Sequence, residues 1–205
     1  MRVSWRFLAA SAVAASVVAW SGEASAQLGE ILTAPKTLID RAIEARSAAD
    51  IKRDNEIVLA VNKAMADAGT IKASTEIYEQ RLLVTGVFDD KDTYDRFEKA
   101  VRAVKGVKRL YWHAAYVSKA DQEARGKAGT MIDWPAAMAM ETKAKGRLIG
   151  TAGVADVNFR VAADAFATVY ILGRARSQEE RDKALARARD GEGVKKVVSY
   201  VDVRP

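Results

Sequence analysis

The chain has 205 residues, 49% of them hydrophobic, and its 33 basic and 27 acidic residues give a net charge of +6. This length allows one domain of ordinary size or two small ones, and the basic balance favours anionic partners such as nucleic acid, acidic proteins or anionic lipid headgroups. Because the sequence has no cysteine, disulfides, thiolate metal sites, a cysteine nucleophile and a lipidated cysteine are excluded.

Residues 1–26 have the pattern of a secretory signal peptide. Arg2 and Arg6 precede an apolar run of 14 residues, Phe7 to Trp20, and a small-residue motif ends at Ala26. We expect cleavage after about Ala26 and a periplasmic protein without a lipid anchor. An uncleaved anchor helix is the alternative, but the run is shorter than the roughly 20 residues that span a bilayer. Export argues against nucleic acid as a partner.

Residues 27–50 form an amphipathic segment, which we predict to be helical after Pro35. Apolar residues, among them Leu28, Ile31, Leu38 and Ile43, alternate there with charged ones. This segment either docks on the domains that follow, which we favour, or lies on a membrane.

Two copies of one unit make up the rest of the chain, at residues 51–118 and 136–205. Gly86 and Gly106 are 20 residues apart, and so are Gly173 and Gly193. An offset of 87 residues relates the two pairs and keeps the hydrophobic class of the positions between them. Residues 119–135 are polar and contain glycine, so they are predicted to be a linker.

The first copy predicts a helix followed by two strands. Ile57, Val58, Val61 and Met65 share one helical face, and Gly69 follows them. Residues 74–88 then predict two short strands. Their expected turn, Glu79-Gln80, lacks the usual turn residues, and the adjacent apolar pair Leu83-Val84 interrupts the alternation of the second strand.

A second helix and a last strand complete each copy. In the first copy, Asp89 or Asp90 is expected to cap the helix and Gly106 to end it, before a strand over residues 107–117. The helix has a predicted buried stripe of Tyr94, Phe97, Val101 and Val104. In the second copy, Ser177 and Glu180 predict a capping box, Gly193 holds the place of Gly106, and residues 194–203 form the last strand.

The expected fold class is therefore α+β, with two small αββαβ domains. The last strand should lie parallel to the strand before its helix, which gives a three-stranded mixed sheet with two helices on one face. About 65 residues is a marginal size for independent folding, so the two copies are candidates for packing on each other.

This glycine frame resembles that of the BON (bacterial OsmY and nodulation) domain family. In each copy a strand ends in LLVTG or VYILG, and a final helix runs into Gly-Val and an apolar strand. The resemblance implies an exported dual-domain protein that maintains the bacterial envelope, by phospholipid binding in some members and by osmotic-stress protection in others. The chain lacks the lipobox cysteine of lipoprotein members, and Gly146, Gly150 and Gly153 crowd the first helix of its second copy.

No pattern of catalytic, cofactor-binding or metal-binding residues is present in the sequence. His113 is the single histidine and lies inside a strand pattern, where an ordinary packing role is favoured over general-base catalysis. The segment Gly191-Glu192-Gly193 follows a helix and has Lys196 where a dinucleotide-binding motif has its third glycine. The aspartates of residues 89–95 lack the glycine and the terminal glutamate of a calcium loop. We therefore expect a protein that is not an enzyme, with no cofactor.

Lipid binding has more support, at the start of the second copy. The candidate residues combine apolar side chains with cations: Trp134, Met138, Met140, Lys143, Lys145 and Arg147. Such side chains enter the headgroup region and meet anionic lipid, and the resemblance implies the same helix as the lipid contact. The alternative, which we favour at this point, is that Trp134 packs in the linker and Met140 joins the core.

A protein-binding or chaperone-like adaptor is the competing function. Exposed sheet edges accept strands from partners, and a basic surface suits acidic envelope proteins. The four glycines Gly86, Gly106, Gly173 and Gly193 are expected to be structural.

Overall fold

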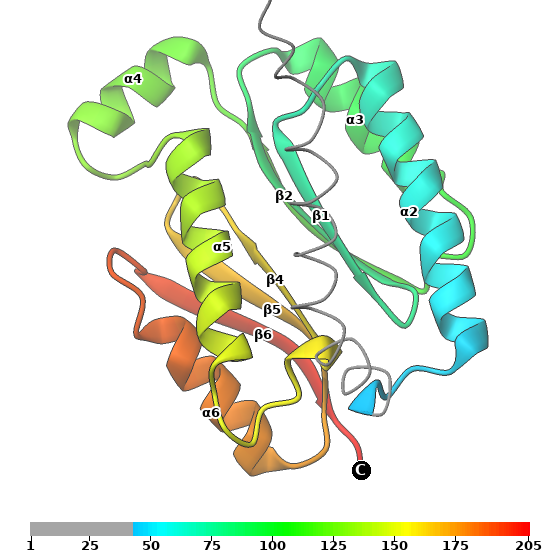
Figure 1. The fold of residues 1–205 in the computed structure, drawn as a ribbon. Helices are drawn as coiled ribbons and strands as arrows, with labels where there is room; N and C mark the ends of the chain where they lie inside the picture. The colour runs from blue at the N-terminus through cyan, green and yellow to red at the C-terminus, as the bar shows by residue number, and fades with distance from the viewer. Residues whose placement is uncertain (1–42) are drawn as a thin grey trace, which may run out of the picture. The chain divides into compact units, whose positions relative to one another are not determined.

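The computed structural model describes residues 43–205 (Figure 1). The predicted signal peptide and most of the amphipathic segment 27–50 lie outside the described residues. Residues 48–50, the end of that segment, form the first turn of helix α2 (Ala48–Ala68). Ser47 caps this helix by accepting from the amide of Asp50, and Gly69 ends it at φ +72°.

The first half of the fold is the predicted αββαβ unit. Helix α2 leads into strands β1 (Ala73–Tyr78) and β2 (Arg81–Phe88), which pair antiparallel. Helix α3 (Lys91–Arg102), capped by Asp90, returns the chain to strand β3 (Arg109–Tyr116). Strand β3 lies parallel to β2, so the predicted three-stranded mixed sheet is confirmed, and its order is β1-β2-β3.

The second half repeats this order. Helix α5 (Trp134–Ile149) and a 3₁₀ turn η1 (Asp156–Asn158) precede strands β4 (Phe159–Ala163) and β5 (Thr168–Ala175). Helix α6 (Gln178–Arg189) then leads to strand β6 (Lys196–Val203), which pairs parallel with β5. The second mixed sheet has the order β4-β5-β6, and the α+β class with two such units is confirmed.

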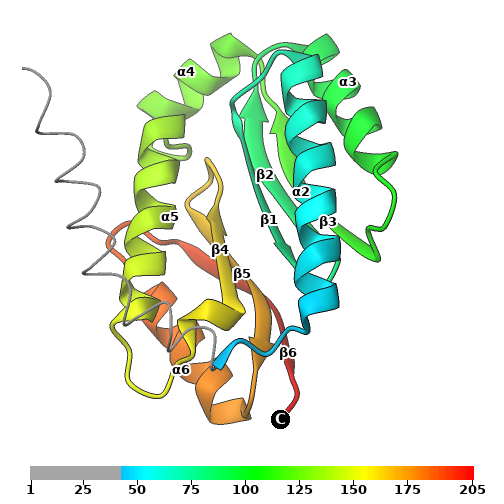
Figure 2. The ribbon, with the colours of Figure 1, turned by 45° about the vertical axis from the view of Figure 1, so that its right-hand side comes forward.

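The two sheets pack on each other through the faces that their helices leave free. In β2, Leu82, Val84 and Phe88 belong to the core under α2 and α3. Leu83 points the other way and packs with Tyr170 and Leu172 of the second sheet. This explains the apolar pair Leu83-Val84, because a strand that is buried on both faces does not alternate. The layers are thus helices, sheet, sheet and helices, and Figure 2 shows α2 and α3 beside the first sheet.

The sequence predicted that Gly106 ends helix α3, and this prediction is wrong. The helix ends at Arg102, and Gly106 lies in the following turn at φ +88°, as its counterpart Gly193 does at φ +76°. Close approach occurs instead at the other pair of glycines. A Cβ atom on Gly86 would lie 2.4 Å from the carbonyl oxygen of Lys72, and one on Gly173 would lie 2.1 Å from that of Asn158.

Three other local features differ from the sequence predictions. The polar segment 119–135 contains helix α4 (Lys119–Lys127), and Met131 after it is buried. Trp134, expected to precede a helix that begins at Pro135, is itself the first residue of α5, because Asp133 is the cap. Ser177 caps α6, but the carboxylate of Glu180 accepts from the amides of Ala155 and Arg176 rather than completing a capping box.

The turn at Glu79-Gln80 is confirmed, and a buried carboxylate explains it. Both residues have positive φ, 52° and 63°, which normally requires Asn or Gly. Asp54 of α2 accepts from the amide of Glu79 at 2.9 Å and from that of Gln80 at 2.7 Å. In the second half the corresponding hairpin is held by its own Asp164, which accepts from the amides of Phe166 and Thr168.

Candidate functional site

Helix α5 carries all six residues that the sequence nominated for lipid binding. Asp133 accepts from the amide of Ala136 at 2.8 Å, so the helix begins directly at Trp134. Ala137, Ala144 and Leu148 are buried and fix which side of the helix faces the core. The six candidate residues therefore take positions around the helix that follow from its period of 3.6 residues per turn.

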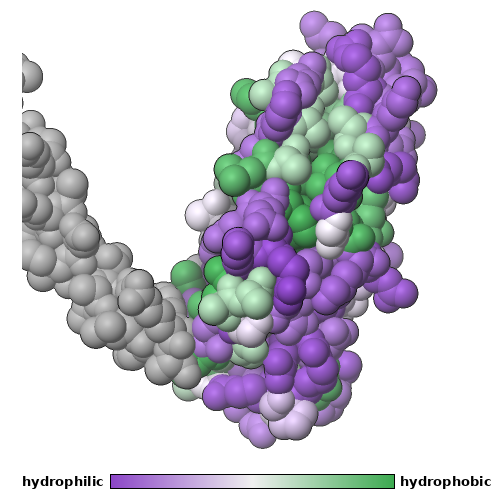
Figure 3. Space-filling view, turned by 90° about the vertical axis from the view of Figure 1, so that its right-hand side faces the viewer, coloured by the Kyte–Doolittle hydropathy of each residue, from purple (hydrophilic) through white to green (hydrophobic). Residues whose placement is uncertain are grey.

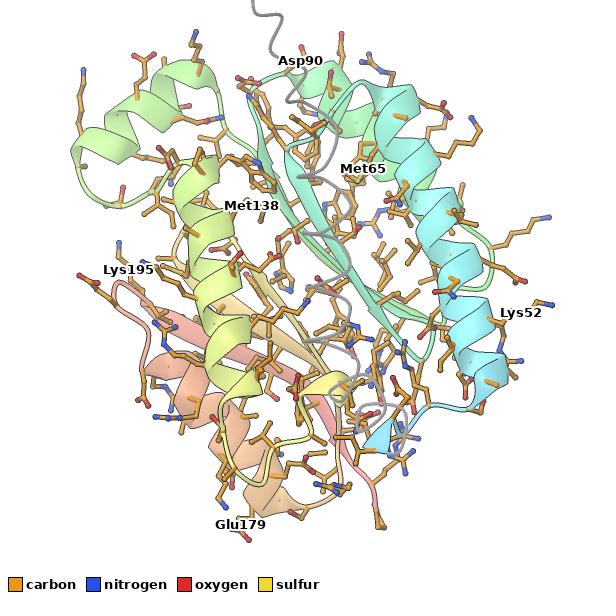
Figure 4. All side chains as sticks on the ribbon, in the orientation of Figure 1. Lys52, Met65, Asp90, Met138, Glu179 and Lys195 are labelled. Atoms are coloured by element: carbon orange, nitrogen blue, oxygen red, sulfur yellow. The ribbon has the colours of Figure 1, made fainter. Side chains whose placement is uncertain are left out.

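One flank of α5 brings together Trp134, Met138 and Lys145. With about 100° per residue, these three positions fall within about 40° of one another, and Ile149 continues the stripe. Trp134 and Met138 are half-buried, Lys145 is exposed and Ile149 is 47% exposed. Figure 4 shows Met138 on the side of α5 that faces the first sheet. We call the four residues Trp134, Met138, Lys145 and Ile149 the α5 flank.

The other three predicted residues lie elsewhere on the helix. Met140 packs against the core of the second half, as the alternative interpretation of the sequence supposed. Arg147 is directed toward Gly191, at whose position a Cβ would lie 2.9 Å from its guanidinium. Lys143 is exposed, on the solvent side of α5 between these groups and the flank. Ile149 was missed by the sequence analysis, although the helical spacing from Met138 and Lys145 leads directly to it.

Two carboxyl groups lie beside the α5 flank, where α5 approaches strand β1. Glu141 accepts from the hydroxyl of Ser74 at 2.9 Å and from the amide of Ala163 at 3.3 Å. The pKa of Glu76 is raised to about 7, chiefly by burial and also by the neighbouring Glu141, while Arg160 and Lys145 act to lower it. Burial likewise raises the pKa of Glu141. Lys145 is therefore exposed to solvent and also lies near two carboxyl groups, those of Glu76 and Glu141, whose pKa values are raised.

Helix α2, the counterpart of α5, lacks an equivalent flank. The offset of 87 places Ser47, Ile51, Val58 and Asn62 at the positions of the four flank residues, with no cation among them. Its large exposed apolar residue is Leu59, at 70% exposure. On the face that carries α2, apolar side chains are interrupted by hydrophilic ones (Figure 3). The stripe that combines an aromatic residue, a methionine, an isoleucine and a lysine is therefore present on α5 and has no counterpart at the equivalent positions of α2.

The described part of the chain offers no cluster of metal ligands. No group of three or more His, Asp or Glu side chains in this range is arranged to hold a metal ion. His113 lies between tyrosines at the interface of the sheets, with Nε2 2.7 Å from the hydroxyl of Tyr200. Within the same residues, no helix has the length and apolar character to cross a membrane.

Part of the chain matches the model of a known protein family. The BON domain model matches residues 139–205, from α5 to the last described residue. An uncharacterized protein encoded in the gshII 5′ region of Anaplasma centrale is 27% identical over 152 residues, which cover 74% of this chain and 95% of that protein.

Two solved structures of CdsD, a structural protein of the type III secretion system of Chlamydia trachomatis, also match. The first has 11% identity and a TM-score of 0.28, and the match covers 73% of this chain and 92% of the CdsD chain. The second, the C-terminal domain of CdsD, has 9% identity and a TM-score of 0.31, and the match covers 73% of this chain and 98% of the CdsD chain. These similarities are too low to bear on function.

Proposed function

Because residues 139–205 belong to the BON domain family, we propose that this chain is a non-enzymatic, exported protein of the bacterial envelope that binds anionic phospholipid surfaces through the α5 flank. The observation that carries the proposal is the flank itself. It joins an aromatic, a methionine, an exposed isoleucine and a lysine on one helix, and α2 has no such stripe.

The physical basis is that of interfacial helices. Trp134, Met138 and Ile149 supply apolar surface for the headgroup region, while Lys145 and the nearby Lys143 meet anionic lipid. Each cation close to such a surface contributes about 1 kcal/mol. The second copy carries 13 basic and 9 acidic residues, so the whole half is attracted to an anionic surface.

The cellular role follows from the family and from the predicted leader. The signal-peptide pattern of residues 1–26 supports export to the periplasm. A protein that binds the membrane surface from that side would support envelope integrity or tolerance of osmotic stress, which is the role that the family resemblance implies.

The test is sedimentation with vesicles. The protein is purified from the periplasm of an expressing bacterium, its N-terminus is read by mass spectrometry, and it is spun with vesicles of phosphatidylglycerol or of phosphatidylcholine. We expect pelleting with the anionic vesicles only, weakened by salt. The double variants Trp134→Ala/Lys143→Glu and Ile149→Ser/Lys145→Glu should each reduce the bound fraction about tenfold or more.

A matched control lies on α2. Leu59→Ser/Lys52→Glu removes one exposed apolar residue and reverses one exposed lysine, and so changes the net charge as much as each flank variant does. We expect it to bind as the unchanged protein does. Failure of the unchanged protein to pellet at low salt, or equal losses in control and flank variants, would contradict the proposal.

The alternative is a periplasmic protein-binding or chaperone-like adaptor. The observation that favours it is that β3 and β6 each pair on one side only, so each sheet has an edge strand whose outer backbone groups lack a strand partner among the described residues. Such edges add a strand from a partner. Absent vesicle binding together with main-chain amide shifts in β3 or β6 on adding an envelope extract would favour this function.

A further inference from the structure

A polar pocket lies where the two halves meet, away from α5. It has a volume of about 620 Å³, within the range of small-molecule sites. The first half contributes residues from the start of α2, the β1–β2 turn and the beginnings of β2 and β3, and the second half contributes the end of β6. Pockets that two units build together are common ligand sites.

Arg81 anchors one wall and is 8% exposed. Its Nη1 donates to the carbonyl oxygen of Tyr200 at 3.0 Å, and its Nη2 donates to that of Gly173 at 2.8 Å. Both acceptors belong to the second half, so Arg81 is held in one orientation across the interface. A guanidinium fixed in this way keeps a permanent positive charge at the wall without further loss of side-chain entropy.

The three carboxylates of the lining are already engaged by arginines. Asp202 lies 3.2 Å from Nη1 of Arg81 and 3.7 Å from Nη2 of Arg204. Glu79 forms an ion pair with Arg204 as well. The third carboxylate, that of Asp50, accepts from Nη2 of Arg53 at 3.0 Å. The acids of the pocket therefore have little negative charge left to offer to the remaining cations.

Two cations of the lining stay without an acidic partner. Lys108 and Arg109 are exposed, and neither forms an ion pair within residues 43–205. The guanidinium carbon of Arg109 lies 6.0 Å from the centre of the Tyr111 ring, and that ring stacks on Tyr200 at 3.8 Å. The pocket thus presents two uncompensated positive charges beside an aromatic wall.

We propose that this pocket binds a phosphate-bearing anion. Lys108 and Arg109 neutralise a dianionic group directly, because Lys supplies a mobile ammonium and Arg a planar fork of donors. Arg81 and Arg204 neutralise Glu79 and Asp202 behind them, so the charges of Lys108 and Arg109 remain available to the ligand. Tyr111 lines the wall beside Arg109. The site shares no residue with the α5 flank, so it is independent of the proposed function.

The experiment follows backbone amide resonances of the ¹⁵N-labelled, periplasmically purified protein while inorganic phosphate replaces chloride at constant ionic strength. We expect saturable shifts that centre on residues 108–111 and 202–204. The variant Lys108→Gln/Arg109→Gln should bind phosphate at least about tenfold more weakly. Because both residues are exposed, its unfolding temperature should stay unchanged, and the two single variants give the same readout if it does not.

The control is Lys105→Gln, an exposed lysine outside the pocket, which should keep full affinity. Glycerol phosphate and phosphatidylglycerol vesicles then identify the source of the phosphate. Binding of glycerol phosphate with competition from vesicles indicates a lipid headgroup, and binding without competition indicates a soluble phosphate ester. Absent saturation, or equal losses in Lys105→Gln and in the pocket variant, would overturn the proposal. Retained phosphate shifts in Trp134→Ala/Lys143→Glu separate it from the flank.

Discussion

Nε2 of His113, in the first sheet, lies 2.7 Å from the hydroxyl oxygen of Tyr200, in the second. The imidazole also packs on Tyr170, with ring centres 4.2 Å apart, and the hydroxyl of Tyr170 donates to Asp164 at 2.8 Å. The chain's single histidine therefore joins the two halves through two tyrosines of the second sheet.

Acid should weaken this interface. Burial lowers the pKa of His113, and of the charged groups that face it, Asp164 raises the pKa while Lys196 lowers it. The unfolded chain consequently binds a proton at higher pH than the folded one, so stability falls as pH drops through the ordinary value of about 6.5. In urea denaturation between pH 7.5 and 5.5, His113→Gln should remove this loss. An unchanged slope in the variant would contradict the assignment.

Glu76 should lower the stability of the folded protein as pH rises, which is opposite to the effect of His113. Its pKa of about 7 in the folded protein exceeds the ordinary 4.5. The stability that its proton brings is therefore complete below pH 4.5 and is lost as pH rises through 7. Glu76→Gln should be more stable than the unchanged protein at pH 8, by up to about 3 kcal/mol, and nearly equal to it near pH 5.

The control for Glu76 is Glu56→Gln, which removes an exposed carboxylate from α2. A similar gain at pH 8 in both variants would show that net charge, and not the buried carboxyl group, is responsible. The effects of His113 and Glu76 on the pH dependence of stability have opposite signs and partly cancel in the unchanged protein. Replacing either residue should therefore make the effect of the other visible.

Gly173→Ala should destabilise the second half severely. The new Cβ would lie 2.1 Å from the carbonyl oxygen of Asn158, and φ is +155°, so backbone has to move. We expect a loss of about 3 kcal/mol or more in thermal or urea unfolding. Gly146→Ala is the matched comparison, because it lies within α5 with open space around it. That substitution should stabilise by about 0.5–1 kcal/mol. Equal effects of the two substitutions would refute this account.

Asp54→Ala should release the β1–β2 turn. The substitution leaves the amides of Glu79 and Gln80 without their acceptor. Arg46 loses its bond to Asp54 at 3.0 Å and keeps its ion pair with Glu44. We expect a loss of about 3 kcal/mol in urea unfolding, because buried unpaired groups bear the full desolvation cost.

Two companion variants separate turn geometry from general damage to α2. Adding Glu79→Asn/Gln80→Gly should recover about 1 kcal/mol of the Asp54→Ala loss, because Asn-Gly adopts this turn without outside support. Asp67→Ala removes an exposed ion pair of the same helix and should cost under about 0.5 kcal/mol. If the Asn-Gly turn recovers no stability, Asp54 does not act by supporting the β1–β2 turn.

The repeat and the fold of each unit follow from local patterns. Helical spacing around Ile57 and Val61, a turn at Glu79-Gln80 and the paired glycines are properties of neighbouring residues, and all reappear in the structure. The candidate lipid helix was also identified from its sequence. The sequence also indicated that Met140 belongs to the core side. It did not separate the other candidates into flank and solvent residues, because that division depends on what α5 packs against.

By itself, the sequence determined two αββαβ units, since amphipathic periodicity and capping residues act within one element or its neighbour. Tertiary structure alone decided that the two sheets bury each other's faces, that Asp54 supports a turn 25 residues away, and that Arg81, Lys108 and Arg204 line one pocket. The physical reason is distance along the chain. These contacts join residues that are far apart in the sequence, and no periodic pattern of residues relates them. They form only once both cores have formed.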